Sequence, residues 1–143
     1  MIVVVDASVA LKWFFRLRDD EADMDRALLL LSDIDAGRAH MVQPPHFLAE
    51  MGAVLAREKP VEAQADLGDL LLIDSSYSDD PAIYVTAVDL ACRLGHHMFD
   101  TLYHAAALHM PGATLVTADR RYYDKARNVG QITLLSNFHL PKA

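Results

Sequence analysis

Short apolar runs alternate with amphipathic stretches along this chain. Ile2–Val5 and Leu115–Thr117 predict buried strands, and His40–Gln43 and Ile132–Leu135 are shorter candidates. Because strands alternate with helical patterns and no segment repeats, we expect one α/β domain over residues 1–143. It should have three layers (α/β/α) around a mostly parallel sheet of about four to five strands. Apolar residues at helical spacing predict helices at 9–16, 19–37, 45–58, 61–72, 83–94, 100–109 and 120–127.

Several segments between these elements are less regular. Leu71–Ile73 is apolar enough to run into a short buried strand, whereas the polar, turn-rich Ser75–Pro81 predicts a loop. We interpret the acidic run Asp19–Glu21, with the acids just after it, as the solvated start of a helix rather than as a metal site. Cys92 lies in an apolar helical pattern and is expected to be a buried thiol.

The composition is that of a globular protein. The 143 residues are 52% hydrophobic and 23% charged, which suits one domain with a buried core. No apolar run approaches the ~20 residues of a membrane span, and Ile2–Val5 lacks the basic flank of a signal peptide. We therefore expect a cytoplasmic protein with no membrane contact. The single cysteine excludes an internal disulfide and a cysteine-rich zinc site.

The net charge of −7 argues against a protein that holds nucleic acid over a broad basic surface. It does not exclude a nuclease, because carboxylates gathered to hold divalent ions make the apo protein acidic, and bound ions reverse the local field. RNA contacts would then come from a local basic edge. Each candidate basic residue could equally well lie on a solvated helix face without binding RNA. The candidates are Arg120, Arg121 and Lys125, with Lys12 and Arg127 further out.

Four acids stand where a parallel sheet would bring them together. Asp6 and Asp119 each follow a predicted strand, Asp100 lies in the first turn of a helix, and Glu50 shares a helix stripe with Phe47. Each has an ordinary alternative, because an acid at a helix start can be a cap and Glu50 can reach solvent from the edge of its stripe. However, strand ends and the helix starts that follow them share one edge of such a sheet, so all four carboxylates can converge.

A convergence of four carboxylates makes chemical sense only around cations. Without counter-charge the groups would repel one another and some would take up protons. Oxygen ligands favour Mg²⁺ or Mn²⁺ over zinc, and one or two such ions suit in-line attack of water on a phosphodiester. Ser8 and Thr117 are candidates to orient the carboxylates. The histidines lack the spacing of a metal motif, although His104 lies one turn after Asp100 and could hydrogen-bond to it.

Trp13, Phe14 and Phe15 are consecutive in the first predicted helix. At ~100° per residue, three neighbours fan over most of a helix circumference, so they cannot all face one core. At least one of them is therefore expected to be exposed or to meet a partner.

Four motifs, taken in order, resemble a known family. VVDAS at 4–8, PPHFLAE at 44–50, LGHHMFDTLYHAAAL at 94–108 and TLVTADRRYY at 114–123 are similar to PIN-domain ribonucleases, and more narrowly to VapC-type toxins of bacterial type II toxin–antitoxin modules. The resemblance spans nearly the whole chain. It implies a PIN-like fold, related to the Rossmann fold, and Mg²⁺- or Mn²⁺-dependent endonucleolytic cleavage of RNA. The residues it assigns to the metal-binding catalytic site are Asp6, Glu50, Asp100 and Asp119, supported by Ser8.

The same resemblance implies partners. Such toxins are usually homodimers held inactive by a small antitoxin, which packs on the early helices and reaches toward the acidic site. That arrangement would give Trp13, Phe14 and Phe15 a partner-binding role. The resemblance leaves open whether Asp124 or His104 adds to the site.

Two other classes fit part of the pattern. A receiver-like phospho-acceptor module also groups carboxylates at the edge of a parallel sheet and binds Mg²⁺. Such a module would carry two neighbouring acids after its first strand and a lysine at the end of a late strand. In this chain Asp6 stands alone after the first strand, and the ends of the late strands hold Thr117 and Leu135 instead of a lysine. A catalytically silent module of the same fold, serving only as a binding partner, is mildly disfavoured because all four acids are present.

Overall fold

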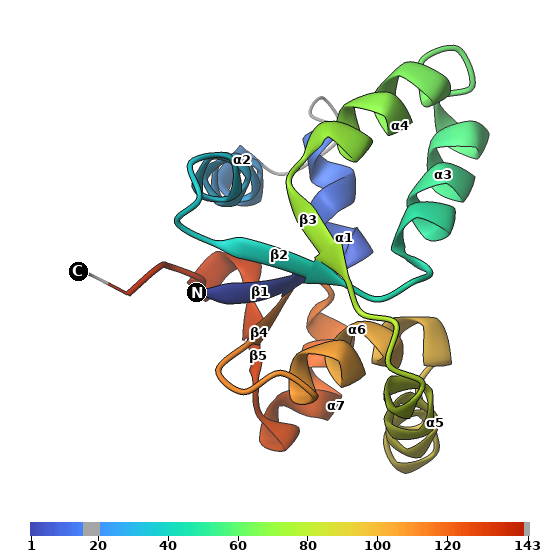
Figure 1. Ribbon diagram of the computed structural model, residues 1–143, viewed down its shortest axis with the longest axis vertical. Coiled ribbons are helices and arrows are strands. Elements are labelled where there is room, and N and C mark those ends of the chain that lie inside the picture. The colour runs from blue at the N-terminus through green and yellow to red at the C-terminus, as the bar shows by residue number, and fades with distance from the viewer. Residues whose placement is uncertain (16–20, 142–143) are drawn as a thin grey trace.

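Five parallel strands form the centre of the computed structural model, which describes residues 1–15 and 21–141. Their order is β3-β2-β1-β4-β5, so the first strand is central and is hydrogen-bonded on both sides (Figure 1). The predicted α/β class and parallel sheet are confirmed. The strands are β1 (Ile2–Val5), β2 (His40–Gln43), β3 (Ser75–Tyr77), β4 (Thr114–Thr117) and β5 (Ile132–Leu134).

Helices cover both faces of this sheet. In Figure 1, α1 to α4 lie on one side, and α5 to α7 lie on the other, with α5 packed against α6. Within the described ranges, no helix is both long and apolar enough to span a membrane. The helices are α1 (Ala7–Ala10), α2 (Glu21–Asp35), α3 (Phe47–Glu58), α4 (Ala63–Leu72), α5 (Ala82–Leu94), α6 (Met98–Leu108) and α7 (Arg120–Ala126).

The central strand is fixed by an unusual side-chain contact at its carboxyl end. Val3, Val4 and Val5 are fully buried, as expected for the middle strand of a parallel sheet. Beyond the last paired residues of β1 and β2, the buried amide of Gln43 accepts a hydrogen bond from the backbone N–H of Val5 and donates one to its carbonyl, both 2.7 Å long. This side chain holds the backbone in place immediately before Asp6.

One strand lies where the sequence predicts a loop. β3 is Ser75–Tyr77, whereas the predicted strand at Leu71–Ile73 is wrong, because Leu71 and Leu72 end helix α4 and are 59% and 84% exposed. β3 lies at the edge of the sheet and pairs with β2. Because its residues are largely exposed there, the strand can form without an apolar sequence.

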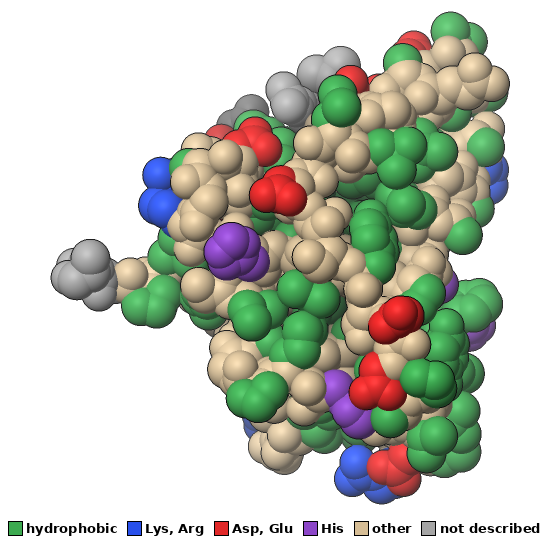
Figure 2. All heavy atoms as spheres, in the orientation of Figure 1, with side chains coloured by type: hydrophobic (Ala, Val, Ile, Leu, Met, Phe, Trp, Pro, Cys, Tyr) green, Lys and Arg blue, Asp and Glu red, His purple; other side chains and the backbone are tan. Residues whose placement is uncertain are grey.

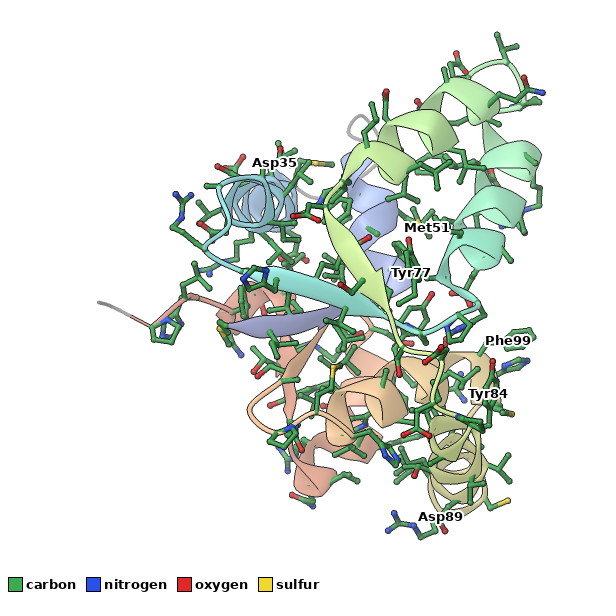
Figure 3. The ribbon with its side chains drawn as sticks, in the orientation of Figure 1. Asp35, Met51, Tyr77, Tyr84, Asp89 and Phe99 are labelled. Atoms are coloured by element: carbon green, nitrogen blue, oxygen red, sulfur yellow. The ribbon has the colours of Figure 1, made fainter. Side chains whose placement is uncertain are left out.

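Helix α5 buries one narrow face and leaves other apolar side chains exposed. Its buried residues are Ile83, Ala87 and Leu90, and the first two pack against Leu102 and Ala105 of α6. Val85 is 73% exposed and Cys92 is exposed, so the prediction of a buried thiol is wrong. When a helix is apolar nearly all round, its sequence does not reveal which stripe a neighbouring helix will cover. Figure 3 shows Tyr84, Asp89 and Phe99 on this side of the molecule.

The first helix begins earlier and is shorter than predicted. α1 starts at Ala7, ends at Ala10 and is followed by a 3₁₀ turn at Leu11–Trp13. Its N-cap is Asp6, because Asp6 Oδ2 accepts a hydrogen bond from the backbone N–H of Ser8. The predicted helix residue Arg16 and the acids at 19 and 20 lie outside the described residues.

Candidate functional site

Asp6 stands at the carboxyl end of the central strand and is the most buried of the four predicted acids, with 8% of its surface exposed. Two hydroxyl groups hold it and connect it to the end of β4. The Ser8 hydroxyl donates to Asp6 Oδ2 and accepts from the backbone N–H of Ala118 (3.0 Å). The Thr117 hydroxyl lies 3.4 Å from the same oxygen and accepts from the backbone N–H of Asp119 (3.1 Å). Asp6 and Asp119 therefore belong to one hydrogen-bonded unit.

Glu50 reaches the same edge from the first turn of α3. Its side chain is 25% exposed, and Oε2 lies 3.5 Å from Nε2 of His46. The same nitrogen lies 2.8 Å from the carbonyl oxygen of Phe99. Because a carbonyl only accepts, Nε2 carries a proton, and His46 ties the start of α3 to the start of α6. Glu50 is therefore only partly exposed and faces His46 at this edge of the sheet.

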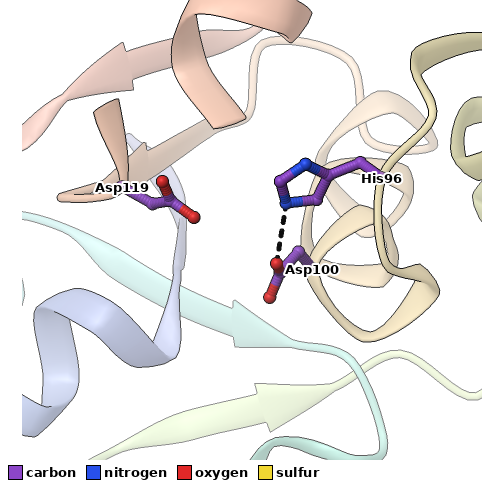
Figure 4. A group of neighbouring side chains, drawn as sticks. All are labelled: His96, Asp100 and Asp119. Atoms are coloured by element: carbon purple, nitrogen blue, oxygen red, sulfur yellow. Dashed lines mark hydrogen bonds and ion pairs between the residues drawn. The ribbon is translucent and has the colours of Figure 1, made fainter. Parts of the chain in front are cut away.

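His96, Asp100 and Asp119 form a compact group in which one ligand atom of each lies within 4.8 Å of the others (Figure 4). Asp100 does not cap its helix, since His97 occupies that position. Asp119 is the N-cap of α7 and accepts from the backbone N–H of Tyr122 (3.1 Å).

His96 is the member of this group that sequence reasoning missed. Its Nε2 lies 2.8 Å from Asp100 Oδ2. No second histidine stands at metal-motif spacing, so we disfavoured a histidine in the site. The available signal was the separation of four residues between His96 and Asp100.

Burial and mutual repulsion raise the pKa of two of the acids. Burial is the main reason that the pKa of Asp6 rises to about 6, and the charges of Asp100 and Asp119 add to it, while hydrogen bonds from Ser8 oppose the rise. Burial likewise raises the pKa of Glu50 to about 7, with contributions from the charges of Asp6 and Asp100. Carboxyl groups that resist ionisation near neutral pH lack counter-charge, which a divalent cation would supply.

A buried hydroxyl beside Glu50 also lacks a partner. Tyr103 Oη makes no direct hydrogen bond to any described residue, yet it lies close enough to Glu50 to lower the pKa of that carboxyl. Burial, together with the nearby carboxylates, raises the pKa of Tyr103 far above its usual range, so the phenol keeps its proton. Such an orphaned donor is a group that a bound water or ligand oxygen would satisfy.

His104 does not contact Asp100, so that sequence-based expectation is wrong. It is fully buried, its Nδ1 lies 2.8 Å from the Tyr122 hydroxyl, and its Nε2 lies 2.7 Å from the Gly130 carbonyl oxygen. His104 lies one turn after Asp100 on α6, and its side chain faces α7 instead of Asp100. Asp124 is exposed on α7.

The predicted basic edge is split between two environments. Arg120 and Arg121 are exposed at the start of α7, and neither makes a hydrogen bond or ion pair within the described part of the chain. Lys125 donates to the Gly95 carbonyl (2.9 Å) and lies 3.3 Å from Nδ1 of His96. In the view of Figure 2, Lys and Arg side chains lie at the edges of the molecule and do not form a broad basic face.

The aromatic run is divided between the core and a groove. Trp13 is 4% exposed and its indole N–H donates to the Ala27 carbonyl (2.8 Å). Phe14 and Phe15 are half-buried. Lys59 donates to the Phe14 carbonyl and to Asp66, and lies over the Phe15 ring. The groove is lined by Trp13, Phe14, Phe15 and Leu72, and by the carboxylates Asp35 and Asp69.

The sheet order and the acids at its carboxyl edge define a parallel α/β domain with a polyacidic site. The family model described as "PIN domain" matches residues 3–128, and the chain belongs to this family. The family predicted from the four motifs is thereby confirmed, and the receiver-like alternative is dropped.

Solved structures of toxin–antitoxin complexes share the fold. VapBC2 from Rickettsia felis, bound to a promoter DNA fragment, is 18% identical, with a TM-score of 0.68 over 94% of this chain and 97% of that chain. VapBC-1 from nontypeable Haemophilus influenzae is 15% identical, with a TM-score of 0.66 over 96% and 100%. FitAB bound to an IR36 DNA fragment is 18% identical, with a TM-score of 0.64 over 96% and 97%. The search among curated proteins found no match.

Proposed function

We propose that this protein is a metal-dependent endoribonuclease that acts as the toxin of a toxin–antitoxin pair, with the cytoplasm as its predicted location. The observation that carries the proposal is the gathering of carboxylates from β1, α3, α6 and the end of β4 at one edge of the sheet, two of them with raised pKa values. Membership of the PIN domain family and the likeness to VapBC and FitAB complexes support it.

The four acids Asp6, Glu50, Asp100 and Asp119 would hold Mg²⁺ or Mn²⁺. Carboxylate oxygens are the donors that these ions prefer, and the buried Tyr103 hydroxyl is available to an oxygen bound beside them. When bound, such an ion lowers the pKa of a water and stabilises the charge that develops on phosphodiester oxygens.

Neighbouring residues would orient the acids and the substrate. Ser8 and Thr117 both act on Oδ2 of Asp6, so the carboxylate is held in one orientation. Arg120 and Arg121 follow Asp119 directly and are exposed, which suits them to bind RNA phosphates beside the site.

The direct test is RNA cleavage by the purified protein, freed of any partner. With structured RNA and Mn²⁺ we expect cleavage that EDTA stops and that Asp6→Asn abolishes, while Asp25→Asn on the exposed side of α2 leaves it intact. Cleavage that survives EDTA or Asp6→Asn would overturn the metal mechanism. No cleavage under any of these conditions would favour the catalytically silent module.

The antitoxin is proposed to bind the groove lined by Phe14 and Phe15. A largely apolar groove accepts the apolar face of an amphipathic helix. Its lining also holds the paired Lys59 and Asp66, and the exposed carboxylates of Asp35 and Asp69 favour a helix with basic residues. We would co-express this chain with a small antitoxin candidate from the same source and measure complex formation by size-exclusion chromatography. Phe14→Glu should prevent the complex, whereas Leu29→Glu, an exposed leucine of α2 that does not line this groove, should not.

We also propose a homodimer, because the resemblance to VapC-type toxins implies one. Exposed apolar side chains support this proposal. Val85, Val88 and Phe99 are 73%, 48% and 55% exposed on α5 and the start of α6. Light scattering should give the mass of a dimer for the wild type and of a monomer for Val85→Lys plus Val88→Lys. The control is Leu71→Lys on α4, which is similarly exposed.

A further inference from the structure

Asp100, His96 and Lys125 form a chain of side-chain contacts. His96 Nε2 lies 2.8 Å from Asp100 Oδ2, and His96 Nδ1 lies 3.3 Å from Lys125 Nζ. The His96 side chain is only 10% exposed. Lys125 is itself held by its 2.9 Å hydrogen bond to the carbonyl of Gly95. The imidazole is therefore contacted at both nitrogens.

The lysine determines which imidazole nitrogen carries the proton. An ammonium group only donates, so Nδ1 of His96 must be the acceptor, and the neutral ring then carries its proton on Nε2. That N–H points to a carboxylate oxygen of Asp100. A nitrogen that donates its proton in this way has no lone pair left for a metal ion.

We infer that His96 is a positioning residue that orients the Asp100 carboxylate, with Lys125 holding the imidazole from behind, and that it is not a ligand of the metal ion. The inference rests on the proposed function, because the orientation of Asp100 matters only if this carboxylate binds a cation. It gives Lys125, which we predicted from the sequence to bind RNA, a role within the site.

One face of a short helix supplies this arrangement. Asp119, Tyr122 and Lys125 recur every three residues at the cap and along α7. The Tyr122 ring packs edge-on against His96 with 4.8 Å between centroids, and its hydroxyl is fixed by His104. α7 therefore holds His96 through two side chains and places Asp119 at its own start.

The first test compares Mn²⁺ affinity of His96 variants by isothermal titration calorimetry. His96→Ala should weaken Mn²⁺ binding about ten-fold, the lower end of the effect of residues that orient metal ligands, and His96→Gln should stay within about three-fold. The glutamine amide can donate from nearly the same place as Nε2. If His96→Gln is as damaging as His96→Ala, the imidazole itself is needed and the positioning role is refuted. His40→Ala, at an exposed histidine of β2, is the control.

The second test uses the sign of the Lys125 effect. Removing a positive charge beside a cation site should by itself strengthen cation binding. The positioning role predicts the opposite, so Lys125→Met should weaken Mn²⁺ binding several-fold when His96 is present and should not weaken it in the His96→Ala background. Tighter binding in both backgrounds would overturn the inference.

The third test determines which nitrogen of the His96 imidazole carries the proton. In ¹⁵N-histidine NMR spectra of the metal-free protein, we expect His96 to carry its proton on Nε2 and the Nδ1 resonance to move in Lys125→Met. This readout separates the two possible failures. A protein with this tautomer that binds no Mn²⁺ contradicts the proposed function, whereas a protein that binds Mn²⁺ with the His96 proton on Nδ1 contradicts the inference.

Discussion

The amide side chain of Gln43 hydrogen-bonds to both backbone groups of Val5, at 2.7 Å in each direction. Gln43 is fully buried, and Val5 is the residue directly before Asp6. The position of the first acid therefore depends on a polar side chain in the neighbouring strand as well as on the backbone ladder of the sheet.

Replacing Gln43 by leucine should destabilise the protein by about 2–5 kcal/mol, because two buried backbone groups lose their partners. Urea denaturation monitored by circular dichroism measures this change. The same substitution at Gln64, which is exposed on α4, should change the free energy of unfolding little. Equal effects at the two positions would show that the Val5 contacts contribute nothing.

The metal-free protein should lose stability as the pH rises. The pKa of Asp6 is raised to about 6 from 3.8, so the folded state binds more protons than the unfolded chain. This contribution is fully present below about pH 4 and is lost as the pH rises through about 6, at a cost of roughly 2–3 kcal/mol.

Asp6→Asn should remove much of that pH dependence, because asparagine can still cap α1 and does not ionise. Thermal melts at pH 4.5, 6 and 8 in EDTA check this, with Asp25→Asn as the exposed control. An unchanged loss of stability between acid and alkaline pH in Asp6→Asn would contradict the raised pKa.

Mn²⁺ should raise the melting temperature of the wild type, since it binds the folded site far better than the unfolded chain. Glu50→Gln combined with Asp100→Asn should weaken this response and should raise the stability of the metal-free protein at neutral pH, because like-charge repulsion is relieved. Differential scanning fluorimetry with and without Mn²⁺ measures both effects. A double mutant with a full Mn²⁺ response would show that these carboxylates do not share a cation.

Arg120→Gln combined with Arg121→Gln should weaken RNA binding at every sequence and make it less salt-dependent. Two lost phosphate contacts reduce the slope of log affinity against log salt by about 1.4 for a single strand. Fluorescence anisotropy with a labelled RNA and the cleavage-deficient Asp6→Asn protein provides the measurement. Arg57→Gln, at an exposed arginine near the end of α3, is the control and should leave the slope unchanged.

The class of fold was predictable from the sequence because the buried strands carry strong local signals. Ile2–Val5 is entirely β-branched and Thr114–Thr117 is β-branched except for Leu115, and such short runs are typical of a strand that is buried on both faces. The edge strand Ser75–Tyr77 was missed because its residues are polar and its stability comes from pairing with β2. Pairing between distant segments leaves no trace in local composition.

The gathering of the four candidate acids at one edge was predictable for a related reason, since each stands at the end of a strand or the start of a helix. Glu50 was the informative one, because a carboxylate within an apolar stripe requires an explanation. His96 and Gln43 were not found. Both hydrogen-bond to groups on other elements. The polarity of Gln43 does not distinguish it from an ordinary surface residue, and the separation of four residues from Asp100 was the one signal for His96.

The central place of β1 in the sheet has a consequence for synthesis of the chain on the ribosome. β1 is made first, yet it pairs with β4, and the bond from Thr117 to Asp6 joins residues 111 positions apart. A nascent chain cannot assemble the four acids until β4 has left the exit tunnel, whereas helices α1 and α2 emerge long before. A partner that binds the early helices would have that interval in which to reach them.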